Sequence, residues 1–389
     1  CPAVPGEYSL PTPPLDLQQQ LQGLKHGELS DQLRTKIIRW LHMDICRYSL
    51  YPGKRNLYYE AARLLVYFYP ALRDVNGTGF NSWWRQLKNR TKNQRKSLSD
   101  IQMVQAQREK YGKRRRQEEE GQSTSATSSC IRQTVPLEDQ SEDTDTLAAH
   151  RLFMVREMRR SPEDRHPDRI RDAMCRTHAA RRRLIEQKDS DEQQCLTVAD
   201  VLSEYPALAL ETEIFNEFQR LTGSDVCGSL TTFVETYGRA IIHAASKRKH
   251  VRKHLLDLPA HLQDADDISS LAAAVWTALP LLLKESPTEI VHVDPLAADP
   301  AHPCVEVSGA LWAPSSITVR LESFSVNVTN LNAAVALVLS LYWVYNIHYS
   351  RRLRKVFTFL ENVLGLAQGS TASLLVTKLE NEIGFKATK

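Results

Sequence analysis

The sequence lacks the motifs of the common catalytic classes. It has no G-x-x-x-x-G-K-[ST] phosphate loop, no G-x-S-x-G nucleophile elbow and no H-E-x-x-H zinc motif. Each of these patterns places a nucleophile, a ligand or a run of backbone amides where one class of enzyme needs it. Without them no residue can be assigned a catalytic role, and no cofactor is indicated. We therefore expect a protein that is not an enzyme.

Paired cysteines are also missing. The seven cysteines are odd in number and scattered, and none belongs to a C-x-x-C pair. A secreted disulfide framework would need an even set at short spacings, so free thiols in a reducing compartment are expected. Residues 1–14 are rich in proline and lack the apolar core of a signal peptide. Both features predict an intracellular protein.

Acidic residues are absent from the stretch between Asp74 and Asp100. A helix predicted to begin near Trp83 has an apolar side, which includes Leu87, and an adjacent cationic arc of about 100°. Such an uncompensated arc suits a nucleic-acid backbone, an acidic protein groove or an anionic membrane surface; the alternative is a solvated face of a core-packing helix. The predicted nucleic-acid-binding residues are Arg85, Lys88, Lys92, Arg95 and Lys96.

No apolar run is long enough to predict a membrane span. A span needs about 20 apolar residues, whereas the most apolar segment, Leu331–Tyr349, contains Asn332, Ser340 and His348. Its apolar residues lie nearly all round a helix, which is typical of an element buried on several sides. We expect this segment to be the central helix of a C-terminal domain, packed between strands and helices, with no membrane partner.

The fold class predicted is mainly α with a small C-terminal α+β part. The net charge is only +4, and 42% hydrophobic and 25% charged residues are ordinary globular values. Alternation over residues 317–328 changes phase at Glu322-Ser323, which indicates a β-bulge or two separate strands. The predicted parts are a disordered segment 1–29, a basic three-helix module 30–98, a charged Ser/Thr-rich linker 99–147, a helical region 148–260, and an α+β region 261–389 packed with the preceding helices.

Two further clusters have functional interpretations. The run Lys113, Arg114, Arg115 and Arg116 is compatible with a nuclear-import signal, so a nuclear location is favoured over a cytoplasmic one; the alternative is a solvated linker. The residue types of His292, Asp294, His302 and Cys304 can ligate zinc, but their spacing matches no standard site. The three prolines nearby favour a stiff loop between strands, and no metal is predicted.

Several short aromatic and basic motifs resemble a known family. Taken together, they are similar to vertebrate, especially fish, proteins of the sterile alpha motif domain-containing protein 3 type, although no sterile alpha motif is found. The resemblance implies a non-enzymatic intracellular protein and transfers no catalytic residue. The motifs are Tyr51-Pro52, Tyr69-Pro70-Ala71-Leu72, Trp84–Lys88, Arg181–Arg183, Tyr205–Leu208 with Glu217-Phe218, and Leu341–Tyr349.

These observations favour an adaptor or nucleic-acid-associated protein whose basic N-terminal helix contacts polyanions. A protein-interaction scaffold acting through the C-terminal α+β domain is the alternative, and an unrecognised hydrolase or nuclease is the least favoured. Protein partners are expected in either of the first two cases. The oligomeric state has no signature in the sequence.

Overall fold

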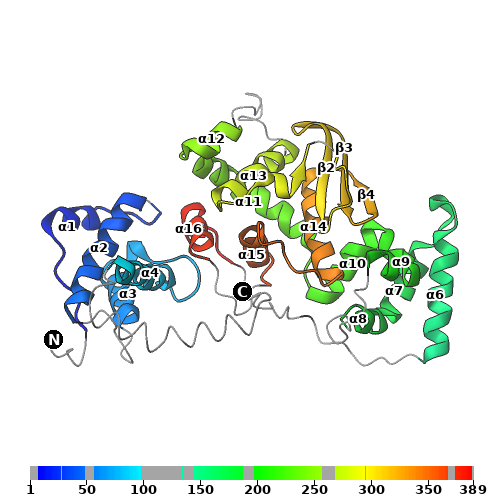
Figure 1. Cartoon of the computed structure of the whole chain (residues 1–389), viewed down its shortest axis with the longest axis horizontal. Coiled ribbons are helices and arrows are strands. Elements are labelled where there is room, and N and C mark those ends of the chain that lie inside the picture. The colour runs from blue at the N-terminus through cyan, green and yellow to red at the C-terminus, as the bar shows by residue number, and fades with distance from the viewer. Residues whose placement is uncertain are drawn as a thin grey trace. The chain divides into compact units, whose positions relative to one another are not determined.

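The computed structural model describes residues 8–27, 29–48, 57–97, 134, 143–186, 197–255, 268–293, 295–366 and 373–387. Figure 1 labels its helices and strands. The chain divides into two compact units: unit 1 comprises Cys1–Ile131 with Thr371–Lys386, and unit 2 comprises Arg132–Ser370 with Ala387–Lys389. The described elements are mainly helices, with one small sheet near the C-terminus, which confirms the predicted fold class.

Unit 1 packs its helices around one apolar core. The apolar residues that recur at helical spacing point into this core. Three of them, one from each of three helices, are fully buried: Ile37, Leu65 and Trp83. Ser30 caps the first of these helices, because its Oγ accepts a hydrogen bond from the amide of Leu33 at 3.1 Å. The elements are α1 (Leu15–Gln22), α2 (Asp31–Tyr48), α3 (Leu57–Phe68), η1 (Pro70–Leu72), α4 (Asn81–Ser97) and α16 (Leu374–Ile383).

The structure differs from the expectation that residues 1–29 are disordered. This segment contains α1, whose Leu17 and Leu21 are buried in the core of unit 1. Tyr8 is buried as well, and its hydroxyl donates a hydrogen bond to the Asp44 carboxylate at 2.8 Å. Proline and glutamine dominate the local composition, but two leucines four residues apart give a short helix one apolar face to bury.

Helix α16 belongs to unit 1, although the sequence places it in the α+β region 261–389. The side chain of Asn381 accepts a hydrogen bond from the Val75 amide at 2.7 Å and donates one to the Asp74 carboxylate at 2.8 Å. The ammonium group of Lys378 pairs with Asp31 at 2.8 Å. A local sequence pattern cannot predict such contacts, because they join positions about three hundred residues apart.

Unit 2 combines a helical array with a four-stranded sheet. In the sheet, of order β1-β2-β3-β4, the β1–β2 pair is parallel and the other pairs are antiparallel. The elements are α6 (Thr144–Met158), η2 (Pro162–Asp164), α7 (Pro167–Arg176), α8 (His178–Glu186), α9 (Val198–Glu204), η4 (Pro206–Ala209), α10 (Glu211–Thr222), α11 (Val226–Ser246), α12 (Lys249–Leu255), α13 (Ile268–Leu282), η6 (Pro287–Glu289), β1 (Val291–His292), β2 (Cys304–Ala310), β3 (Ala313–Leu321), β4 (Phe324–Val328), α14 (Leu331–Val344) and α15 (Arg354–Val363).

The phase change at Glu322-Ser323 is a tight hairpin between two strands. Leu321 pairs with Phe324 across the turn, so the two alternating series face each other on one side of the sheet. Glu322 has a positive φ of 50°, and its carboxylate accepts a hydrogen bond from the amide of Val198 at 2.9 Å. Of the two alternatives that the sequence allows, separate strands is therefore correct.

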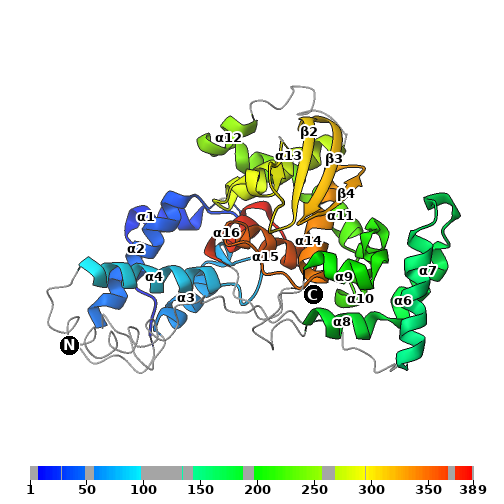
Figure 2. The same cartoon turned by 45° about the vertical axis from the view of Figure 1, so that its right-hand side comes forward.

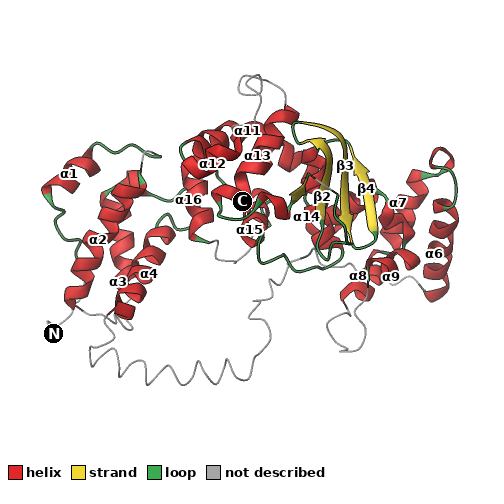
Figure 3. Ribbon diagram, turned by 45° about the horizontal axis from the view of Figure 1, so that its top comes forward, coloured by secondary structure: helices red, strands yellow, loops and turns green. Residues whose placement is uncertain are grey.

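Helix α14 is the central buried helix of unit 2, as predicted, although it ends at Val344 rather than at Tyr349. Every residue from Ala334 to Val344 is buried, and the helix contacts α10, α11 and α13 as well as strands β2, β3 and β4 (Figures 2 and 3). Its polar residues have partners inside the protein: the Asn332 amide donates to Thr231 at 2.9 Å, and the Ser340 hydroxyl donates to the carbonyl of Ala336 at 2.8 Å. Among the described helices, none has the length and apolarity needed to cross a membrane.

A buried ion pair joins α8 to α10. The guanidinium group of Arg181 donates two hydrogen bonds to Glu217, at 2.9 and 2.5 Å, and both side chains are fully buried. His178 and Arg220 also contact the Glu217 carboxylate, at 3.1 and 3.0 Å. Burial alone would favour the neutral acid, but the Arg181 charge and these hydrogen bonds hold the pKa of Glu217 well below its ordinary value of 4.5.

This depressed pKa predicts a loss of stability in acid. Because the folded-state pKa of Glu217 lies below the unfolded value, its contribution is complete above about pH 4.5 and is lost as the pH falls further. We expect the difference in unfolding midpoint between the wild type and Glu217→Gln to shrink between pH 5 and pH 3, as followed by circular dichroism at each pH. A difference that stays constant across this range would show that folding does not lower the pKa of Glu217.

Candidate polyanion-binding site

Helix α4 has the apolar side that the sequence predicts. Trp83 and Leu87 are fully buried, and the indole N–H of Trp83 donates a hydrogen bond to the carbonyl of Leu72 at 2.8 Å. At the start of α4, the Asp74 carboxylate accepts a hydrogen bond from the Ser82 amide at 2.8 Å. These contacts fix the rotation of α4 against the core and thereby the direction of its remaining side chains.

The five predicted binding residues divide into two groups. Lys88, Lys92 and Lys96 are exposed and follow one another at a spacing of four residues, which keeps them on one side of the helix. Arg85 and Arg95 are half-buried, and the guanidinium group of Arg95 donates to the Tyr58 hydroxyl at 3.2 Å. We call the three exposed residues the lysine row. Their role in binding stays a prediction.

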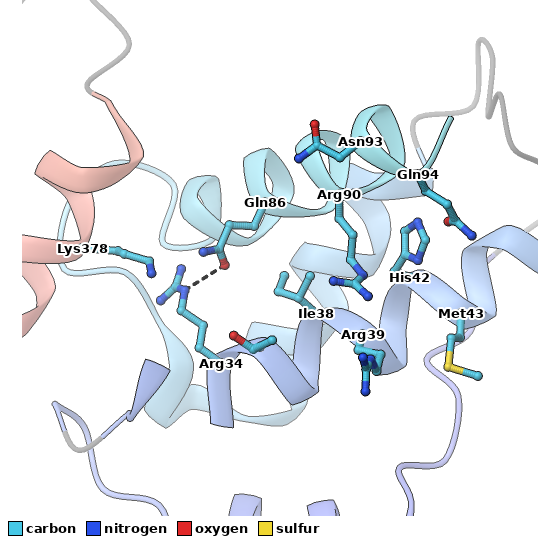
Figure 4. Close-up of a pocket in the computed structure, with 11 residues that line it drawn as sticks. Arg34, Ile38, Arg39, His42, Met43, Gln86, Arg90, Asn93, Gln94 and Lys378 are labelled. Atoms are coloured by element: carbon cyan, nitrogen blue, oxygen red, sulfur yellow. Dashed lines mark hydrogen bonds between the residues drawn. The ribbon is translucent and has the colours of Figure 1, made fainter. Parts of the chain in front are cut away.

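A pocket lies on another side of α4, between this helix and α2 (Figure 4). Its volume is about 630 Å³. Helix α16 contributes one cation, Lys378, at the end of the pocket near Arg34. None of the eleven described residues that line the pocket carries a carboxylate. They are Arg34, Thr35, Ile38, Arg39, His42, Met43, Gln86, Arg90, Asn93, Gln94 and Lys378.

Arg34 is the most firmly held of these cations. Its guanidinium group donates to the Gln86 side chain at 2.8 Å and to the Ser82 hydroxyl, and it lies 4.1 Å from the centre of the Trp83 ring. Burial lowers the pKa of Arg34 to about 10, against the opposing effect of nearby Asp74. The group is therefore still charged at neutral pH, in a position where it is largely removed from water.

The side chains of Arg90 and His42, which come from α4 and α2, lie next to each other in the pocket. The Nε of Arg90 is buried and has no hydrogen-bond partner in the described part of the chain. Burial, together with the charge of Arg90, lowers the pKa of His42 below its ordinary 6.5, so this imidazole is neutral at pH 7. A neutral imidazole next to an arginine with an unmet donor brings no negative charge to this part of the pocket.

The other predicted clusters have different outcomes. Lys113, Arg114, Arg115 and Arg116 lie outside the described residues, as does Asp294. Of the remaining zinc candidates, His292 is in β1, His302 lies beside the Tyr342 ring at 6.1 Å, and Cys304 is buried in β2 with a pKa raised to about 11 by burial. Within the described ranges, no group of three potential ligands is arranged to hold a metal.

Comparison with known proteins gives two relatives. The chain is 26% identical to sterile alpha motif domain-containing protein 3 of Homo sapiens over 390 residues, which cover 97% of this chain and 71% of that protein. The protein of the same name from Mus musculus is 26% identical over 373 residues, covering 92% of this chain and 68% of the relative. The chain is similar to sterile alpha motif domain-containing protein 3. No family model matches it, and no solved structure does.

The similarity to sterile alpha motif domain-containing protein 3 confirms the resemblance inferred from short motifs, and the structure explains several of them. Arg181 pairs with Glu217, and its guanidinium group lies 5.3 Å from the centre of the Tyr205 ring. Arg182 donates a hydrogen bond to the carbonyl of Val344, at the C-terminal end of α14, at 2.7 Å. These motifs therefore meet in the interior of unit 2, where they hold the fold together. The sterile alpha motif itself is not identified in this chain.

The pocket was not predicted from the sequence. Arg34 and His42 lie on one side of α2, two four-residue steps apart, and Gln86 and Arg90 lie on one side of α4. These spacings indicate one polar side on each helix. Nothing in either pattern indicates that the two sides face each other, or that α16 joins them.

Proposed function

We propose that this protein is a non-enzymatic, adaptor-like protein whose unit 1 binds nucleic acid through the lysine row of α4. The similarity to sterile alpha motif domain-containing protein 3 supports the adaptor-like part, because that name describes a domain composition and no reaction. Nuclear location is part of the proposal and is supported by the Lys113–Arg116 sequence. Arg85 and Arg95 flank the row and add positive charge beside it.

The observation that carries this proposal is the exposure of Lys88, Lys92 and Lys96 in a stretch without acidic residues. Successive members rise about 6 Å along the helix, which sets three cations in a line. Lys88 lies 4.6 Å from the centre of the Trp84 ring, so its aliphatic stem is held close to the helix surface. A row of this kind can neutralise phosphates along a strand without reading the bases.

Replacing the lysine row by glutamine is expected to reduce the salt dependence of DNA binding. In a plot of log Kobs against the logarithm of the salt concentration, each phosphate neutralised on duplex DNA contributes about −0.9 to the slope. Removing three such contacts should therefore make the slope less negative by about 2.7. Fluorescence anisotropy of the full chain with a labelled duplex, titrated at several salt concentrations, measures this slope.

The matched control removes three lysines from unit 2. Lys247, Lys249 and Lys253 are exposed in and beside α12, so their change to glutamine alters the net charge by the same amount. Binding that is absent in the wild type at low salt, or slopes that fall equally in both variants, would reject the nucleic-acid part of the proposal.

The scaffold alternative acts through unit 2. There the large, exposed apolar side chains among the described residues are Leu152, Ile268 and Val293. They belong to α6, to α13 and to the segment after β1, so they do not form one continuous face of a single element. No specific observation favours this alternative over the lysine row.

A further inference from the structure

We propose that the pocket between α2 and α4 is a separate binding site for a compact phosphate ester, held by Arg39 and Arg90 with support from Arg34 and Lys378. This inference goes beyond the proposed function, because it concerns a different surface and a small ligand. It does not depend on nucleic-acid binding by the lysine row.

The pocket and the lysine row lie on different sides of α4. At about 100° per residue, Arg90 is turned roughly 200° from both Lys88 and Lys92. The pocket-lining residues Gln86 and Asn93 are on the same side as Arg90. A ligand in the pocket therefore does not contact the lysine row, and the two surfaces can be disabled independently.

The charge of the pocket favours an anion. Four permanently cationic side chains line it, and the described lining contains no carboxylate. Two of the four already have partners in the protein, since Arg34 donates to Gln86 and Ser82 and Lys378 pairs with Asp31. Arg39, which is exposed, and Arg90 form no ion pair among the described residues. These two arginines are the ones available to a ligand.

Arg90 gives the strongest indication of a ligand. Its Nε is buried and makes no hydrogen bond to any described residue, although a guanidinium donor removed from water ordinarily has an acceptor. A phosphate in the pocket supplies a countercharge, and the planar guanidinium group can bind it through two parallel hydrogen bonds when the side chain turns Nε toward the ligand. His42, on the facing helix, is neutral at pH 7 and adds a ring N–H donor or acceptor.

The size and lining of the pocket indicate an ester rather than a free ion. A volume of about 630 Å³ falls within the range of small-molecule sites and is far larger than one phosphate group needs. Ile38 and Met43 offer apolar surface beside the cations, and the Asn93 amide offers a polar contact. The phosphate can come from a free small ester or from the end of a nucleic-acid strand, since the two present the same group.

The test measures binding of inorganic pyrophosphate and of adenosine 5′-monophosphate to the full chain by isothermal titration calorimetry. We expect binding by the wild type and a loss of about 10-fold or more in affinity in the double variant Arg39→Gln/Arg90→Gln, because two charged donors are removed. The matched control, Lys88→Gln/Lys92→Gln, removes the same charge from the other side of α4 and should bind within about two-fold of wild type by the same reasoning.

A 5′-phosphorylated oligonucleotide and its unphosphorylated counterpart distinguish the two sources. A preference for the phosphorylated strand that disappears in Arg39→Gln/Arg90→Gln assigns the site to strand ends, and binding of the small probes alone assigns it to a free ester. Unchanged unfolding midpoints establish that the variants are folded, and Arg39→Gln alone, at an exposed position, serves if the double variant is not. No binding of any phosphate probe at millimolar concentration, or equal losses in both double variants, overturns the proposal.

Discussion

Replacing Arg181 with alanine is expected to destabilise unit 2 by about 3–5 kcal/mol, the range for removal of one partner from a buried ion pair. Arg181 is fully buried, and besides its two bonds to Glu217 it donates to the Thr177 hydroxyl at 2.8 Å and to the carbonyl of Met174 at 3.0 Å. The variant leaves a buried carboxylate with Arg220 and His178 as its remaining partners. Chemical denaturation of the full chain, followed by hydrogen exchange in peptides from α10, measures the effect in this unit.

Arg183→Ala is the matched control. Arg183 lies two residues after Arg181 and is exposed, so its replacement removes the same charge from the surface. Its effect on stability should stay within about 0.5 kcal/mol, as is usual for surface substitutions. The double change Arg181→Met/Glu217→Gln should cost less than the sum of its single changes, because it does not leave a buried charge unpaired. Equal effects of Arg181→Ala and Arg183→Ala would contradict the role assigned to the buried pair.

The elements predicted correctly from the sequence are those whose signal is local. The apolar residues of α14 surround the helix, and burial on several sides is the arrangement that such a pattern requires. The phase change at Glu322-Ser323 was also visible, but choosing between a bulge and a hairpin depended on which residues pair, and pairing is a property of the folded sheet. The helix-stopping Tyr-Pro pairs likewise give the same turn twice: Tyr69 and Tyr205 have φ values of −127° and −129°.

What the sequence could not predict depends on contacts between distant segments. Helix α16 has an ordinary amphipathic pattern, and nothing in it indicates that Asn381 completes the turn around Asp74 rather than packing with the neighbouring C-terminal helices. The pocket could not be predicted for the same reason, because its lining comes from three helices that are distant in the sequence, α2, α4 and α16. The lysine row, by contrast, belongs to the five cations predicted on α4, because residues of one helix can be placed by its period.

The short motifs on which the resemblance was based show a second reason why surface charge is hard to predict from the sequence. Arg181–Arg183 suggests a basic surface when it is considered alone, yet Arg181 and Arg182 are buried and only Arg183 is exposed. Arg181 pairs with Glu217, 36 positions away. Arg182 pairs with Glu186 within α8 at 3.0 Å and also donates a hydrogen bond to the carbonyl of Val344, 162 positions away. Charge in a sequence therefore indicates binding only where the fold leaves it without an internal partner.

Trp343→Ala is expected to destabilise unit 2 by about 3–5 kcal/mol, since truncating a buried tryptophan removes its packing and leaves a cavity. Trp343 is 3% exposed, and its ring meets that of Phe218 edge-on at 5.8 Å. Its indole N–H donates to the Tyr349 hydroxyl at 2.8 Å, which in turn donates to the Glu361 carboxylate at 2.8 Å and so connects α14 to α15. Denaturation of the full chain, with hydrogen exchange in peptides from α14, measures the loss.

Trp343→Phe separates the contribution of ring packing from that of the indole hydrogen bond. It keeps most of the ring volume against Phe218 but removes the N–H donor, so a loss of about 1–2 kcal/mol is expected from the broken hydrogen bond. The order of stability should then be wild type, Trp343→Phe and Trp343→Ala. If Trp343→Ala leaves the stability of unit 2 unchanged, α14 is not the central packed helix. Its apolar surface would then be available to a partner, and the connection through Tyr349 and Glu361 would not hold α15 in place.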